Sequence, residues 1–170
     1  MTGAERERAL LGVLDGLYRG LGEVAPRAGE DGAAVALYEA ARMVGEAALA
    51  WRERLGDGPA APLAVIVETF EAAAGLDPSG RLSLAVATSL VGPRVLVSLR
   101  DAREEPGDAP LGEGGRVASA VASDAVVAAI WRCARAAESP EAGADPLVGA
   151  DGFAALARRL DGDGYGESFR

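Results

Sequence analysis

The side chains that could do chemistry in this chain come from a short list of residue types. Its 170 residues contain no histidine, lysine, asparagine or glutamine, and all 17 basic residues are arginine. Without an imidazole no Ser-His-Asp or Cys-His arrangement can form, and without lysine neither Schiff-base chemistry nor a P-loop lysine is available. One thiol cannot build a zinc site of cysteine and histidine ligands. Acid–base catalysis by carboxylates remains, but the shortage favours a protein that is not an enzyme.

Two carboxylates interrupt apolar runs and are the candidates for such catalysis. Glu68 lies in "VIVETF" and Asp124 in "VASAVASDAVVAAIW". A carboxylate buried without a partner has a raised pKa, which is typical of a general acid or base. The alternative is that each lies at an edge or pairs with an arginine. Arg94 and Arg100 are the candidates for that role, and also for holding an anionic ligand.

The single thiol, Cys133, lies between two arginines in "RCAR". Neighbouring cations lower the pKa of a thiol and make it reactive. A lone cysteine in an apolar helix, however, commonly packs as a small hydrophobic residue. We favour packing in the core.

The segment 161–170 begins like a calcium loop, with acidic residues and a glycine at loop positions 1, 3 and 6. Tyrosine stands at position 5, however, and no residue is left for the carboxylate at position 12. An EF-hand is therefore excluded, and no metal or other cofactor is predicted. We expect a flexible tail, with docking of Tyr165 and Phe169 to a partner protein as the alternative to a purely solvated end.

Charge and composition limit the partners and the location of the protein. The net charge is −9 and the pI about 4.6, whereas a nucleic-acid binder needs a stripe of cations. We predict no nucleic-acid partner. No uncharged stretch approaches the roughly 18 residues of a membrane span, and no signal peptide is recognisable, so we expect a cytoplasmic protein without membrane contact. The arginine- and alanine-rich composition is typical of a GC-rich bacterial genome.

Hydrophobic periodicity predicts two helices at the N-terminal end of one domain, residues 1–160. The helix over 2–21 opens with a capping box of Thr2 and Glu5 and carries three glycines four residues apart, which would let another helix approach closely. The helix over 32–55 carries an apolar seam with 4-3-4-3-4 spacing. This seam either packs within the domain, which we favour, or pairs two copies of the chain through Leu37, Val44 and Trp51.

The middle of the chain, residues 62–100, fits two structures. Alternation in "LSLAVATSL" and "RVLVSLRD", split by "VGPR", favours a three-stranded antiparallel meander. Prolines placed to start helices, and the alanine content, favour helices instead. A helix over 116–137, apolar nearly all round, should be buried in the middle, and a short helix should follow over 150–160. The predicted fold is α+β, with an all-α bundle as the alternative.

Three functions are compatible with this sequence. The first is a non-enzymatic protein-interaction module, such as an adaptor, chaperone or regulatory subunit, that forms a homodimer through the seam. The second is a small-molecule-binding or sensing domain with a pocket between the meander and the central helix. The third, less favoured, is an acid–base enzyme that uses Glu68 and Asp124.

Overall fold

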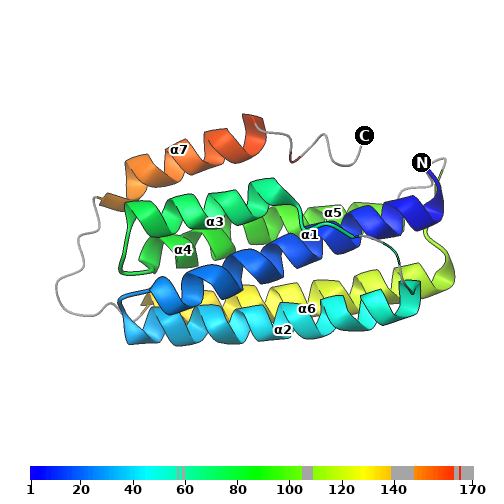
Figure 1. The fold of residues 1–170 in the computed structure, drawn as a ribbon, viewed down its shortest axis with the longest axis horizontal. Coiled ribbons are helices and arrows are strands. Elements are labelled where there is room, and N and C mark those ends of the chain that lie inside the picture. The colour runs from blue at the N-terminus through cyan, green and yellow to red at the C-terminus, as the bar shows by residue number, and fades with distance from the viewer. Residues whose placement is uncertain (57, 59, 105–108, 139–147, 163–164, 166–170) are drawn as a thin grey trace.

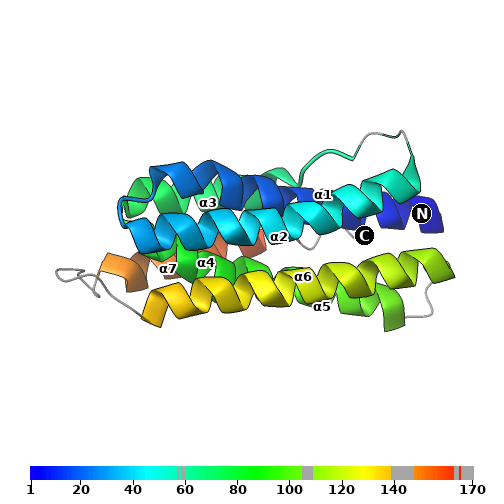
Figure 2. The same cartoon turned by 90° about the horizontal axis from the view of Figure 1, so that it is seen from below.

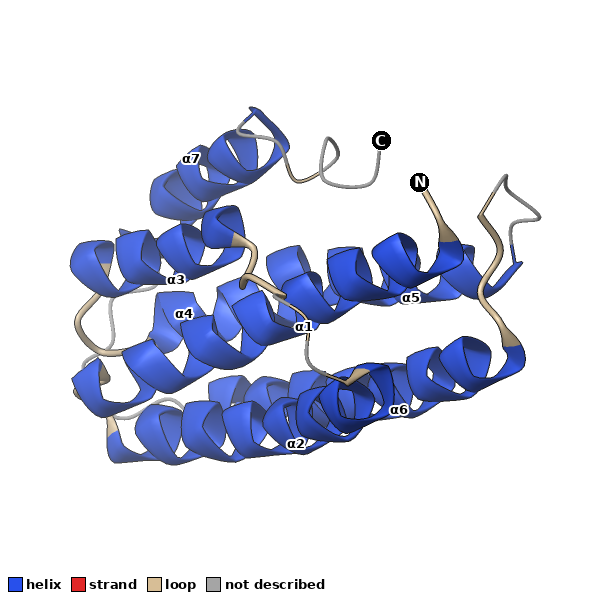
Figure 3. Ribbon diagram, turned by 45° about the vertical axis from the view of Figure 1, so that its right-hand side comes forward, coloured by secondary structure: helices blue, strands red, loops and turns tan. Residues whose placement is uncertain are grey.

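The chain is helical wherever its structure is described. The computed structural model describes residues 1–56, 58, 60–104, 109–138, 148–162 and 165. In this part of the chain there are helices and no strand (Figure 3). The elements in order are α1 (Gly3–Val24), η1 (Ala25–Arg27), α2 (Asp31–Leu55), α3 (Ala64–Leu76), α4 (Arg81–Val86), η2 (Ala87–Val91), α5 (Gly92–Glu104), α6 (Glu113–Glu138) and α7 (Val148–Gly162).

Helices α1, α2 and α6 and the continuous helical stretch α4–η2–α5 (Arg81–Glu104) form a bundle, and α3 and α7 cover one side of it. Helix α2 packs against α1 and α6, α6 also packs against α5, and α5 contacts α1 (Figure 1). Helix α3 lies on α1, and α7 lies on α3 and α4. Seen from below, α2 and α6 run side by side with no helix in front of them (Figure 2). The outer sides of α2 and α6 therefore form one surface of the bundle.

The predicted meander over 62–100 is wrong, and with it the α+β fold; the all-α alternative is right. The buried positions of α3, which include Val65, Thr69 and Ala73, recur every fourth residue. On α5, Val95 and Leu99 are buried whereas Val97 is 45% exposed. Over so short a span, three alternating apolar residues are also compatible with a strand. The packing of the segment as a helix decides between strand and helix.

The "VGPR" segment is a wide helical turn instead of a hairpin. In η2, a π-helical turn, the backbone N–H of Gly92 donates to the carbonyl oxygen of Ala87. A Cβ on Gly92 would lie 2.2 Å from that oxygen and 2.7 Å from the side chain of Ile130, so only glycine fits. Pro93 lacks an N–H and removes one helical hydrogen bond, and a π-turn accommodates this loss without ending the helix.

The prediction for α1 is confirmed. Thr2 Oγ1 accepts a hydrogen bond from the Glu5 backbone N–H, and the Glu5 carboxylate accepts one from the Thr2 backbone N–H, which completes the capping box. A Cβ on Gly12 would lie 2.7 Å from the Ala61 carbonyl oxygen, and one on Gly20 would lie 2.5 Å from the Phe70 ring. The glycines thus let α3 and the segment before it approach α1 closely, as the spacing predicts.

The predicted burial of the helix over 116–137 is wrong for one of its sides. Residues Ser119, Ala122, Val126, Ala129 and Cys133 of α6 face the bundle and are buried. On the outer side, Val117 is 59% exposed and Trp131 is 66% exposed. The sequence is apolar on both sides, so its pattern does not show which side meets water.

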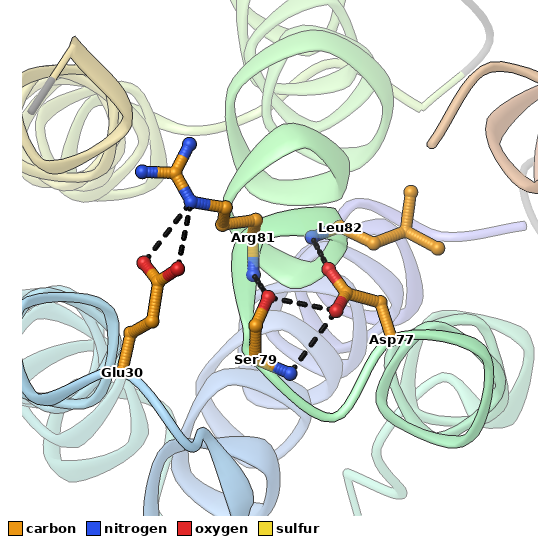
Figure 4. Close-up of polar contacts among 5 residues, drawn as sticks. All are labelled: Glu30, Asp77, Ser79, Arg81 and Leu82. Carbon is orange, nitrogen blue, oxygen red and sulfur yellow. Dashed lines mark hydrogen bonds and ion pairs between the residues drawn. The ribbon is translucent and has the colours of Figure 1, made fainter. Parts of the chain in front are cut away.

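A polar corner joins the start of α2 to the turn between α3 and α4 (Figure 4). Asp77 accepts hydrogen bonds from the backbone N–H and hydroxyl of Ser79, at 3.0 and 2.7 Å, and from the backbone N–H of Leu82 at 2.9 Å. Arg81 Nε donates to both carboxylate oxygens of Glu30, at 2.9 and 3.0 Å. This corner holds the chain reversal that lets α4 and α5 return along the bundle.

Candidate functional site

A groove with both aromatic and charged walls lies between α1 and α2. It has a volume of about 540 Å³ and lies where the outer edges of the two helices meet. Both walls carry an aromatic side chain and a guanidinium group. The lining residues are Tyr18, Arg19, Gly22 and Glu23 of α1, with Tyr38, Ala41 and Arg42 of α2.

The floor of this groove is flat because its residues are small. A Cβ on Gly45 would lie 2.7 Å from the ring of Tyr18, so this ring lies directly on the backbone of α2. A Cβ on Gly22 would lie 4.0 Å from that of Ala41, which is ordinary contact. Packing therefore does not require glycine at position 22, and its effect is to keep the floor low. Tyr18 and Tyr38 remain 46% and 68% exposed.

Each of the two arginines of this groove makes an ion pair with an exposed carboxylate of its own helix, and the charge of Arg19 also acts to lower the pKa of buried Asp15. Arg19 lies 3.3 Å from Glu23, and Arg42 lies 2.7 Å from Glu46, each pair four residues apart. Exposed pairs of this kind contribute little, typically about 0–1 kcal/mol. Both guanidinium groups can therefore turn toward a ligand at small cost.

A second groove, of about 490 Å³, lies between α2 and α6. Its walls are apolar except at one end, where Arg54 and Glu113 lie beside Gly114. Beneath that end the carboxylate of Glu7 is buried; it accepts a hydrogen bond from Trp51 Nε1 at 3.2 Å and forms an ion pair with Arg54. Because the chain supplies its own anion at the start of α6, this end does not favour an anionic ligand.

A further buried acid lies on α1. Asp15 is 4% exposed and forms an ion pair with Arg52 of α2. Burial raises the pKa of Asp15, while the neighbouring guanidinium of Arg52 opposes the rise. Neither this ion pair nor the ion pair of Glu7 with Arg54 was predicted from the sequence. An acid inside the apolar stripe of α1, together with the "WRER" of α2, was the available signal.

The two candidate catalytic carboxylates lie apart from each other and from both grooves. Glu68 is exposed on α3, 3.6 Å from Arg159 of α7, and Asp124 is exposed on the outer side of α6. Figure 1 places α3 and α6 on different sides of the bundle. Neither side chain is buried, and the two do not form an acid–base pair.

The two candidate ligand-binding arginines of α5 are engaged within the chain. Arg94 donates to Asp161 of α7, at 3.1 Å from Nε and 2.7 Å from Nη2, and to the Leu90 carbonyl oxygen at 2.9 Å. Arg100 lies 3.0 Å from Asp101. Neither arginine lines the two grooves, and Arg94 instead ties the end of α7 to α5.

The seam of α2 belongs to the core of the bundle. Leu37, Val44 and Trp51 are each at most 1% exposed. This agrees with packing within the domain, the interpretation we favour from the spacing. It also corrects the idea of a dimer seam, because these side chains present no surface to a second copy.

The remaining sequence candidates lie near the C-terminal end. Tyr165 is 8% exposed, and its hydroxyl lies 3.0 Å from that of Ser98. Burial raises the pKa of Tyr165 to about 12, so docking of this ring to a partner would first require its release. Phe169 lies outside the described residues. Cys133 is buried in the core, and burial raises its pKa to about 12 although Arg132 opposes the rise.

In the described part of the chain, no three acidic or cysteine side chains come together as a metal site would require. Of the two grooves, the one between α1 and α2 therefore has more side chains that could bind a ligand. None of these residues was a candidate from the sequence. The spacing of Tyr18 with Gly22, and of Tyr38 with Arg42, puts each pair on one helical edge, which was the available signal. Comparisons with protein-family models, curated proteins and solved structures found no match.

Proposed function

We propose that this chain is a non-enzymatic binding protein whose α1–α2 groove holds a small planar aromatic anion. The observation that carries the proposal is the composition of this groove, in which two tyrosines and two arginines surround a floor of Gly22 and Ala41. Its volume of about 540 Å³ falls within the range of small-molecule sites, roughly 300–1,000 Å³.

The aromatic part of the ligand is inferred from the two tyrosines. Aromatic rings attract one another in offset or edge-to-face arrangements, which contribute about 0.5–1.5 kcal/mol beyond burial of their area. Tyr18 is held against the backbone of α2 and offers a fixed ring, while Tyr38 is exposed and free to close over a bound molecule. A flat ring system fits a floor on which no side chain larger than alanine stands.

The anionic part is inferred from the two guanidinium groups. Arginine binds a carboxylate through two parallel hydrogen bonds, which are stronger than bonds between neutral groups. Arg19 and Arg42 rise from opposite walls, and their present partners, Glu23 and Glu46, are exposed. Glu23 is the one carboxylate among the lining residues, so the walls carry a net positive charge despite the acidity of the whole chain.

The proposal is tested by titrating the protein with 2-naphthoate, using the isosteric neutral 2-naphthamide as the control ligand, in a calorimeter. We expect naphthoate to bind more tightly. A charge-assisted hydrogen bond contributes about 1.5–3 kcal/mol, so Arg42→Ala should weaken naphthoate binding at least about tenfold. The matched control is Arg116→Ala, which removes an exposed arginine from α6.

A second pair of variants tests the aromatic contact. Tyr38→Ala should weaken binding of both ligands, whereas Leu49→Ala, which removes an exposed apolar side chain elsewhere on α2, should leave it unchanged. Equal affinity for naphthoate and naphthamide would remove the role of the arginines. Failure of naphthoate to bind, or binding that survives Tyr38→Ala, would refute the site.

A further inference from the structure

The outer side of α6 is an apolar surface that the bundle leaves open. Helix α6 packs on α2 and α5, but only 28% of its most apolar window is buried, compared with 56% for the stretch Arg81–Glu104. Figure 2 shows α6 at the outside of the bundle. The exposed apolar residues on this side are Val117, Ala120, Val121, Val127, Ala128 and Trp131.

This surface has the same pattern read in either direction from Asp124. Seven residues away on each side, about two helical turns, lie Val117 and Trp131. Eleven residues away lie side chains of opposite charge, Glu113 before and Arg135 after. Both are exposed, and neither makes an ion pair with another described residue. A helix with this pattern complements a second copy of itself that runs in the opposite direction.

We infer that two copies of this chain form a dimer through the outer side of α6, antiparallel, with Asp124 of each copy at the two-fold axis. In this register Trp131 packs on Val117 of the second copy, and Val121 packs on its Ala128. Arg135 meets Glu113 of the second copy at both ends of the contact. Such an isologous interface, in which the same patch is used twice, is the commonest arrangement of homodimers.

The size of the surface predicts a weak dimer. Its apolar side chains expose on the order of 500 Å², within the size of patch that marks interaction sites. A standard interface buries roughly 800 Å² per partner. The two Asp124 carboxylates face each other across the axis, and their repulsion lowers the affinity further. Asp124→Ala should therefore strengthen association, by about tenfold if the repulsion amounts to 1.4 kcal/mol.

A membrane is the other apolar partner to consider, because α6 and the stretch Arg81–Glu104 are long and apolar enough to cross one. The observations favour the second copy. Asp124 lies in the middle of the apolar surface of α6, where a bilayer would meet it with hydrocarbon at high cost. The net charge of −9 also repels anionic lipid.

Charge exchange tests the register. We would measure association by sedimentation equilibrium for Glu113→Arg, Arg135→Glu and an equimolar mixture of the two. Each variant alone should associate at least about tenfold more weakly than the native chain, because two attractive pairs become repulsive. In the mixture every pair is attractive again, and a heterodimer should form with about the native affinity. A mixture no better than the separate variants would refute the antiparallel register.

Oxidation of single cysteines gives a second test of the register. Only residue 124 meets its own copy, so Asp124→Cys should form an intermolecular disulfide faster than Val117→Cys, the control. Native Cys133 is buried and does not compete. Faster cross-linking of Val117→Cys would indicate a parallel dimer and overturn the inference.

Removal of the Trp131 side chain is a third test of the dimer. Trp131→Ala should abolish association at concentrations where Leu49→Ala, on the outer side of α2, still dimerises. A native chain that stays monomeric at millimolar concentration would overturn the inference, as would a monomer that binds neutral phosphatidylcholine vesicles through Trp131. Neither outcome bears on the ligand groove, because α6 contributes no residue to it.

Discussion

Two glycines of α1, two residues apart, should respond to alanine in opposite ways. At Gly20 a new Cβ would lie 2.5 Å from the ring of Phe70, which is fully buried and cannot move away. At Gly22 the nearest atom within 4 Å is the Cβ of Ala41, at 4.0 Å. Alanine therefore overlaps a neighbour in the first case and only makes ordinary contact in the second.

The magnitudes follow from these two contacts. Alanine in place of glycine stabilises a helix by up to about 1 kcal/mol, and this gain applies to both sites. Overpacking a core costs about 1–3 kcal/mol and applies only at Gly20. Gly22→Ala should thus raise the free energy of unfolding by up to about 1 kcal/mol. Gly20→Ala should lower it by about 0–2 kcal/mol, so that it is about 1–3 kcal/mol less stable than Gly22→Ala.

Thermal and urea unfolding measure both effects. For a chain of this size, 1 kcal/mol corresponds to about 2–4 °C in Tm. Gly75→Ala, in the last turn of α3 with no atom within 4 Å of the new Cβ, is the control for a gain without new packing and should resemble Gly22→Ala. If Gly20→Ala proved as stable as Gly22→Ala, the close approach of α3 to α1 would be refuted, and a loss of stability in Gly22→Ala would show that packing does require this glycine.

Three further changes have defined outcomes. Asp77→Ala removes three hydrogen bonds at the α3–α4 turn and should lower stability by about 2 kcal/mol in urea titrations at neutral pH. Partial burial raises the pKa of Asp77, but its hydrogen bonds outweigh burial and hold the pKa below its ordinary value. The stabilisation by Asp77 is therefore present above the ordinary pKa of aspartate and is lost as the pH falls through the folded-state pKa. The stabilities of the native chain and of Asp77→Ala should thus converge in acid. A difference that stays constant with pH would contradict this. Trp51→Phe leaves buried Glu7 without its indole donor and should lower stability by about 1–3 kcal/mol in the same assay, whereas an unchanged stability would mean that this bond contributes nothing. Cys133 should react with a thiol reagent only as fast as the chain unfolds, and rapid labelling of native protein would contradict its burial.

The elements with two independent sequence signals were predicted correctly. In α1 the capping box of Thr2 and Glu5 and the apolar stripe agree, and in α2 the seam extends over about five helical turns, longer than a typical strand. Over 62–100 only short apolar runs were available. The burial that makes α5 a helix comes from its contact with α6, through residues such as Leu99 and Ser119, whose hydroxyl donates to the Leu99 carbonyl oxygen at 2.8 Å. The spacing of apolar residues within 62–100 gives no information about this contact between α5 and α6.

The groove between α1 and α2 was not predicted from the sequence, for a related reason. Tyr18 and Tyr38 belong to different helices and are brought together by the reversal of the chain between α1 and α2. Carboxylates that interrupt apolar runs were expected to be buried, but Glu68 and Asp124 lie on outer sides of their helices. The acids that are buried, Glu7 and Asp15, lie on α1, and Asp15 interrupts its apolar stripe.

The distribution of arginine explains why binding is more plausible at the α1–α2 groove than elsewhere on this acidic chain. Three arginines that join helices pair with carboxylates that are largely buried: Arg52 with Asp15, Arg54 with Glu7, and Arg81 with Glu30. Three others, Arg94, Arg132 and Arg159, join helices through more exposed carboxylates. Releasing one of the first three would leave a buried charge without its partner, at a cost of several kcal/mol. Arg19 and Arg42 form their ion pairs with carboxylates that are exposed to water, so these two pairs can separate at smaller cost. Both arginines lie beside the two tyrosines, and this combination of exposed cations and aromatic rings favours the α1–α2 groove as a binding site.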